Sequence, residues 1–98
     1  MSRDSGSVFD SWVSGGAHLK DQLDRAATSI VLNIAEGAGE FSKDEKQRFY
    51  RMARRSATET AAVLDILDRR KAVPNIAMEP ARELLVRVVS MLVRLAST

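Results

Sequence analysis

The chain has 98 residues, of which 45% are hydrophobic and 29% are charged, a composition that excludes a largely disordered protein. It contains no Cys and one His, which argues against a disulfide framework, a thiolate zinc site and a cluster of His ligands. Fifteen Lys and Arg against 13 Asp and Glu leave a net charge of +2, which is too small to indicate a partner by itself.

The N-terminal part of the chain has few structural signals. The sequence MSRDSGSVFD carries acidic residues where a signal peptide has bases, and no apolar run reaches membrane-spanning length. We therefore expect a cytoplasmic protein with no membrane partner, folded as one domain over residues 1–98. Residues 1–18 form a short N-terminal segment in which Phe9 and Trp12 predict a short helix that ends at Gly15 and Gly16.

A first long helix is predicted over residues 19–36. Its apolar residues recur at spacings of three or four, as on one face of a helix, and they are Leu19, Leu23, Ala26, Ile30 and Ile34. Gly37 follows, and we expect it to end the helix in a left-handed turn.

A second, longer helix is predicted over residues 43–71. Ser42 and Glu45 have the spacing of a capping box, in which each side chain satisfies an amide of the first turn. The middle of its apolar stripe is made of small residues, which allow a neighbouring helix to approach closely. These are Ala53, Ser56, Ala57, Thr60 and Ala61.

A third long helix is predicted over residues 79–97, with Pro80 in its first turn, where a missing amide hydrogen costs nothing. Its broad apolar face contains Leu84, Leu85, Val88, Met91, Leu92 and Leu95. Three long helices with short connections predict an all-α, antiparallel up-and-down helical bundle, with the N-terminal helix as a short fourth member. Because the apolar faces are wide for so small a core, we expect the chain to form a homo-oligomer.

A basic cluster lies at the start of the second helix. Residues 43–55 hold six bases against Asp44 and Glu45, a local balance of +4, and the bases are Lys43, Lys46, Arg48, Arg51, Arg54 and Arg55. Arg48, Arg51 and Arg55 fall within about 60° of one another on a helix, so they form one stripe. Such a stripe can bind phosphates of RNA or DNA, because guanidinium groups pair bidentately with them. The alternative is a solvated face with intersubunit ion pairs to acids such as Asp65, Asp68 or Glu59. Tyr50 is the one aromatic residue that we expect to lie between these arginines on the helix surface, so the sequence gives little support for base stacking.

Other polar residues predict structure rather than chemistry. Asn33 and Glu36 precede Gly37 and are expected to tie the loop to the next helix, and Arg54 and Glu59 are expected to pair between helices or subunits. Phe9 and Trp12 are expected to anchor the N-terminal segment on the bundle or on a neighbouring subunit. No arrangement of nucleophile, base and metal ligands can be drawn, so we expect no catalytic residues, no metal and no cofactor.

Two blocks of sequence resemble a known family. The runs QLDRAATSIVLNIAEGAG and SKDEKQRFYRMARRSATE resemble the motifs of the bacterial four-helix-bundle family first noted as open reading frames in intervening sequences of large-subunit ribosomal RNA genes. The chain departs from the motifs at Val31, where the family usually has Pro, and at Arg55, where it has Gly. The family's long first helix also has no full counterpart here, so the resemblance implies a truncated four-helix bundle.

The resemblance also implies assembly, since members of this family form rings, commonly pentamers. Distantly related accessory proteins of diversity-generating retroelements bind nucleic acid and a reverse transcriptase, which implies nucleic acid or a partner protein as the ligand. Residues and resemblance together predict a non-enzymatic, homo-oligomeric scaffold or adaptor that binds nucleic acid or a ribonucleoprotein through the basic helix face. The alternative is a module for protein–protein assembly that binds no nucleic acid.

Overall fold

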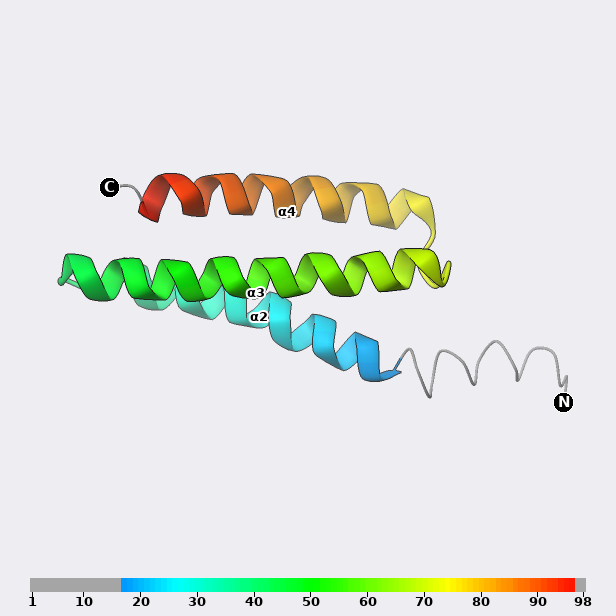
Figure 1. Cartoon of the computed structure of the whole chain (residues 1–98), viewed down its shortest axis with the longest axis horizontal. Helices are drawn as coiled ribbons and strands as arrows, with labels where there is room; N and C mark the ends of the chain where they lie inside the picture. The colour runs from blue at the N-terminus through cyan, green and yellow to red at the C-terminus, as the bar shows by residue number, and fades with distance from the viewer. Residues whose placement is uncertain (1–16, 97–98) are drawn as a thin grey trace, which may run out of the picture.

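The structure, a computed structural model, describes residues 17–96. In this part of the chain three helices follow one another, namely α2 (Ala17–Ala38), α3 (Lys43–Arg69) and α4 (Asn75–Ala96), and no strand is present. Each helix runs opposite to the preceding one, and α3 packs against both of the others (Figure 1). The predicted all-α arrangement of three long helices is therefore confirmed. The predicted N-terminal helix with Phe9 and Trp12 lies outside the described residues.

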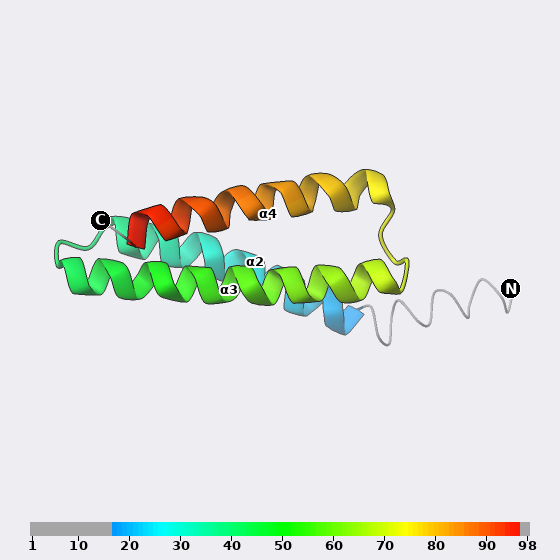
Figure 2. The same ribbon diagram turned by 45° about the horizontal axis from the view of Figure 1, so that its top comes forward.

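Two groups of buried side chains hold the three helices together. Figure 2 shows that α2 crosses behind α3, so that its C-terminal end lies near α4. At that end Tyr50 and Ala53 of α3 pack with Leu92 of α4, and Ile34 of α2 covers them. The second group lies toward the opposite end of α3 and consists of Leu19, Val63, Leu64, Leu67 and Met78.

Small residues bring α2 and α3 close together, as the sequence predicts. Ala53 and Ala57 of α3 have no exposed surface. The Ser56 hydroxyl donates a hydrogen bond of 2.8 Å to the Ser29 hydroxyl of α2. Because a hydroxyl pair of this length leaves no room for longer side chains, the contact between the two helices depends on both serines remaining small.

Gly37 has a different role from the predicted one. It lies inside α2, which continues to Ala38, and its φ is not positive. A Cβ at Gly37 would lie 2.6 Å from Cε1 of Tyr50, which is buried. The glycine is therefore present because the Tyr50 ring occupies the space of a side chain, and not because the backbone turns left-handed. The prediction of a left-handed glycine at the end of the helix is wrong.

The ends of α3 are formed by side-chain and backbone hydrogen bonds. The hydroxyl of Ser42, the N-cap, accepts from the Glu45 amide at 3.3 Å, which confirms half of the predicted capping box. At the other end the Ala72 amide donates to the Leu67 carbonyl, and the Lys71 amide donates to the Asp68 carbonyl. This is the Schellman pattern, with Lys71 in the left-handed conformation at φ 54° that glycine usually occupies. The helix therefore ends at Arg69, two residues before the predicted end.

Helix α4 begins four residues earlier than predicted, at Asn75. The Pro74 carbonyl accepts from the amides of Ala77 and Met78, which starts the helix before Pro80. Pro80 thus lies in the second turn, where it removes a helical hydrogen bond, and the prediction of its place in the first turn is wrong. Within α4 only Met78 and Leu92 are buried.

We predict opposite effects of alanine at Gly37, inside α2, and at Gly39, just after α2. Gly37→Ala places a methyl group against the Tyr50 ring, at a cost of about 1–3 kcal/mol that exceeds the gain of about 1 kcal/mol from helix propensity. Gly39→Ala meets no atom closer than 3.6 Å and should stabilise by about 0.4–1 kcal/mol. Chemical denaturation of both variants measures this, and equal shifts would contradict the close contact between Gly37 and Tyr50.

We also predict that Lys71→Gly stabilises the protein by about 1 kcal/mol, because glycine adopts the left-handed conformation without a steric cost. Lys71→Ala is the matched control, since it removes the same side chain and retains the Cβ that makes this conformation unfavourable. Thermal unfolding should place the glycine variant above the alanine variant. The reverse order would show that the left-handed turn is absent in solution.

Candidate nucleic-acid interface

The predicted arginines gather on one side of α3. A hollow of about 340 Å³ is lined by Arg48, Arg51, Met52, Arg54, Arg55 and Thr58. All four arginines are exposed, and the inner face of the same helix is occupied by Ala53 and Ala57. We call this set of four residues, Arg48, Arg51, Arg54 and Arg55, the arginine face.

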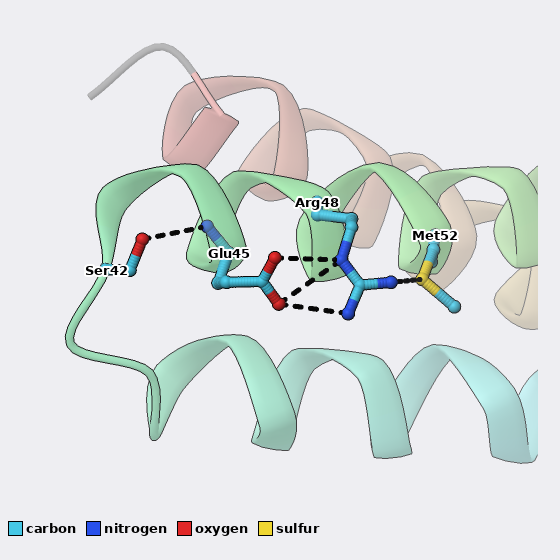
Figure 3. A network of polar contacts seen from close by, with 4 residues as sticks. All are labelled: Ser42, Glu45, Arg48 and Met52. Carbon is cyan, nitrogen blue, oxygen red and sulfur yellow. Dashed lines mark hydrogen bonds and ion pairs between the residues drawn. The ribbon is translucent and has the colours of Figure 1, made fainter.

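Arg48 is the most fixed member of the arginine face. Its Nε and Nη2 donate to the Glu45 carboxylate, with Nη2 3.0 Å from Oε2, while Nη1 lies 3.8 Å from the Met52 sulfur (Figure 3). The Glu45 carboxylate is therefore engaged by Arg48, in place of the second bond of the predicted capping box. The Arg48 hydrogen bond lowers the pKa of Glu45 and raises that of Arg48.

An aromatic ring lies beside the arginines, but it is not the predicted one. Tyr50 is buried against Gly37 and so does not interleave with them. Phe49 takes this place, with the Arg48 guanidinium carbon 4.7 Å from its ring centroid, a cation–π distance. Phe49 and Tyr50 are neighbours in sequence. Which of them lies beside the arginines depends only on which side of α3 faces the core.

Three members of the arginine face have no acidic partner in the described part of the chain. Arg51, Arg54 and Arg55 form no ion pair among residues 17–96. Their positive charge is therefore not neutralised locally, and the three guanidinium groups border the same hollow. Such a group of exposed guanidinium donors can bind an anion with several oxygen atoms, such as a phosphate diester.

The two lysines of the basic cluster are separated from the hollow. Lys43 is the exposed first residue of α3. The Lys46 ammonium donates to the carbonyls of Gly37 and Ala38, at 3.0 and 3.4 Å, at the C-terminus of α2. Because the last carbonyls of a helix carry partial negative charge, Lys46 stabilises the connection between α2 and α3.

The polar residues of the motifs either bind locally or form no ion pair within residues 17–96. Asn33 donates from Nδ2 to the Ser29 carbonyl and hydroxyl, so it binds within α2 and not to the following loop. Glu36 and Glu59 are exposed, and among the described residues neither forms an ion pair; in particular, Arg54 and Glu59 are not paired within the chain.

Asp65 and Asp68 have a partner that the sequence analysis missed. Arg82 of α4 donates to Asp65 at 2.7 Å and lies 3.2 Å from Asp68, and these contacts raise its pKa. The two carboxylates, expected as intersubunit partners of the arginines, thus bind an arginine of the same chain. The sequence does show two acids three residues apart on one helix and a basic residue on the next. To predict that they pair, however, one must know how α3 and α4 are aligned along their lengths.

Residues 17–96 contain neither a cluster of metal ligands nor a membrane-spanning helix. No group of three or more His, Asp or Glu side chains there is placed to bind a metal ion. None of the three helices has both the length and the apolar character needed to cross a bilayer.

Comparison with known proteins identifies the family. The antiparallel α2–α3 pair and the two motifs that it carries define a helical-bundle protein of the intervening-sequence type. The chain belongs to the 23S rRNA-intervening sequence protein family, whose model matches residues 15–94. Searches of the curated proteins and of the solved structures found no match to this chain.

We predict that the Glu45 carboxyl titrates below the ordinary pKa of glutamate and that Arg48→Gln returns it toward that value. Since the folded-state pKa is the lower one, the stability from this pair is present above the unfolded-state pKa and is lost as the pH falls through the folded-state pKa. NMR titration of the Glu45 carboxyl measures the change. Arg51→Gln is the control, because it leaves the pair intact, and an Arg48→Gln titration that matches the wild type would contradict the pair.

Proposed function

We propose that the chain is a non-enzymatic, homo-oligomeric helical-bundle scaffold that binds the phosphate backbone of nucleic acid through the arginine face. The observation that supports this most directly is the hollow bordered by Arg51, Arg54 and Arg55, none of which has an acidic partner in the described residues. A cytoplasmic location and the absence of a cofactor belong to the same proposal.

The geometry favours binding to phosphates over recognition of bases. From Arg48 to Arg55 the stripe extends for about 10 Å along the helix axis, at about 1.5 Å per residue. The aromatic residue nearest to the arginines, Phe49, is held against the Arg48 guanidinium. Binding should therefore depend on charge, decrease steeply with salt and show little preference for sequence.

A charge-neutralising variant tests this function. In Arg51→Gln/Arg54→Gln/Arg55→Gln, three cations are lost from the hollow while the buried face of α3 is unchanged. We expect the slope of log affinity against log salt for a short single-stranded RNA to become shallower by about 2, at about 0.7 per lost contact. Fluorescence anisotropy over a salt series measures the slope, and DNA of the same sequence shows whether the sugar matters.

The matched control removes the same charge elsewhere. Arg25, Arg69 and Arg70 are exposed and form no ion pair among the described residues, so Arg25→Gln/Arg69→Gln/Arg70→Gln should leave most of the affinity in place. If the two variants lose affinity equally, the arginine face is not the site. If the wild type binds neither RNA nor DNA at low salt, the nucleic-acid function is wrong.

The second candidate function, protein–protein assembly without nucleic acid, is favoured by one observation. Large apolar side chains of α4 are exposed, with Leu84 at 62% and Val86 at 64%. If the arginines served only subunit contacts, the triple arginine variant would dissociate the assembly, and no nucleic acid would bind to the wild type at low salt.

A further inference from the structure

A second hollow adjoins the arginine face. Helices α3 and α4 lie side by side (Figure 1), and a groove of about 420 Å³ lies between them. Because apolar atoms make up most of its walls, we call it the apolar groove. Its lining consists of Ala57, Thr58, Ala61 and Asp65 of α3 and of Arg82, Leu85, Val86, Val89 and Ser90 of α4.

The apolar groove continues directly from the hollow of the arginine face along α3. Thr58 lines both of them. Steps of four and three residues separate Arg54, Thr58 and Ala61, so the three lie along one side of the helix. At about 1.5 Å per residue, Arg54 and Ala61 are about 10 Å apart along the helix axis. A chain molecule that is bound by the arginines can therefore reach into the groove with its next group.

The charged groups of the apolar groove are already paired. Asp65 is the one acid in its lining, and it accepts from Arg82 at 2.7 Å. Where the groove meets the hollow, the Thr58 hydroxyl donates to the Arg54 carbonyl at 3.2 Å. The groove thus offers an uncompensated charge of neither sign, whereas the hollow beside it offers guanidinium groups that have no ion pair among the described residues.

The two surfaces together fit a ligand that is anionic at one point and flat and apolar at the next. A nucleotide of a single strand has this form, because its phosphate carries the charge and its unstacked base exposes a flat face. In a duplex the bases are paired and stacked, so their faces cannot enter a groove on the protein. Aliphatic walls take the face of any base out of water, so the contact requires no aromatic residue and no particular sequence.

We propose that the apolar groove binds an unstacked base of a single-stranded nucleic acid whose phosphates are held by the arginine face. This inference rests on the proposed function and specifies its ligand as a single strand. The phosphate lies at Arg51, Arg54 and Arg55, and the base that follows packs between Ala61 of α3 and Val86 of α4. A duplex binds through the arginines alone.

The first test removes the bases and keeps the phosphates. A short uridine strand is compared with a strand of the same length and backbone that has no bases, so both carry the same charge. We expect the full chain to bind the abasic strand about five-fold more weakly. Because the lost contact is apolar, this ratio should stay constant as the salt concentration rises, while both affinities decrease. Fluorescence anisotropy measures both strands.

The second test fills the groove without changing the charge of the protein. Ala61→Gln places a long neutral side chain in the groove, whereas Ala62→Gln places the same side chain on the exposed surface of α3, outside both hollows. We expect Ala61→Gln to bind the uridine strand no better than the abasic strand, and Ala62→Gln to behave as the wild type. An RNA duplex should bind equally to all three proteins.

The opposite wall of the groove is tested by two valines of equal exposure. Val86 is 64% exposed on α4 and Val31 is 65% exposed on α2, so Val86→Ser and Val31→Ser remove similar apolar surface and leave the core intact. Only Val86→Ser should reduce the difference between the uridine and abasic strands. Circular dichroism identifies any variant that loses its helix content, and if Ala61→Gln does so, the two valine variants decide.

A bound base also leaves a direct spectroscopic signature. Its ring current should shift the NMR signals of the Val86 and Val89 methyl groups when the uridine strand is added. The abasic strand should leave these signals in place, and the Val31 methyl groups on α2 should respond to neither strand. Methyl signals of the groove that move equally with both strands would contradict a base in the groove.

The outcomes separate this inference from the proposed function. Equal binding of the uridine and abasic strands by the wild type overturns the base site and leaves phosphate binding by the arginine face in place. A difference between the strands that persists in both Ala61→Gln and Val86→Ser means that the base binds elsewhere, which also overturns it. If the wild type binds neither strand at low salt, the proposed function is wrong and the base site with it.

Discussion

The close approach of α2 to α3 is the constraint on which the rest of the structure depends. The Tyr50 ring fits against the backbone of α2 only because Gly37 has no side chain, and the Ser29 and Ser56 hydroxyls bind each other directly. Ala53, which lies three residues from both Tyr50 and Ser56 along α3, is fully buried and packs with Leu92 of α4. Any larger side chain along this contact would push the helices apart and open the apolar core on both sides of α3.

This inward packing also decides where the charges lie. Once Ala53 and Ala57 face the neighbouring helices, the helical period places Arg51 and Arg55 on the opposite side, in water. The arginine face is thus a consequence of how α3 is buried, and no loop or insertion is needed to build it. The helical period likewise places Phe49 beside Arg48, whereas Tyr50 points into the core. Belonging to the 23S rRNA-intervening sequence protein family establishes the kind of protein, while the arginines supply the chemistry of the proposed interface.

The sequence alone was sufficient for the helices and the basic stripe, because both follow from periodicity and charge. It was insufficient wherever the outcome depended on a distant residue. Glycine is typical of a helix end, but at position 37 it is needed because the ring of Tyr50, thirteen residues later, leaves no space for a side chain. Pro80 suits a first turn, yet Pro74 provides an earlier start for α4. The pairing of Arg82 with Asp65 needed the register of two helices, which spacing along one helix does not contain.

The uneven distribution of buried residues also bears on how the chain acquires its structure during synthesis. Most of the buried residues lie on α2 and α3, which are joined by a short turn that Lys46 fastens to the end of α2. These two helices are close in sequence and leave the ribosome before α4, so they can pack as a hairpin while the rest of the chain is still being made. Helix α4 is then added to a surface that already exists, and until it arrives the α3 side chains that pack with Met78 and Leu92 lack this cover.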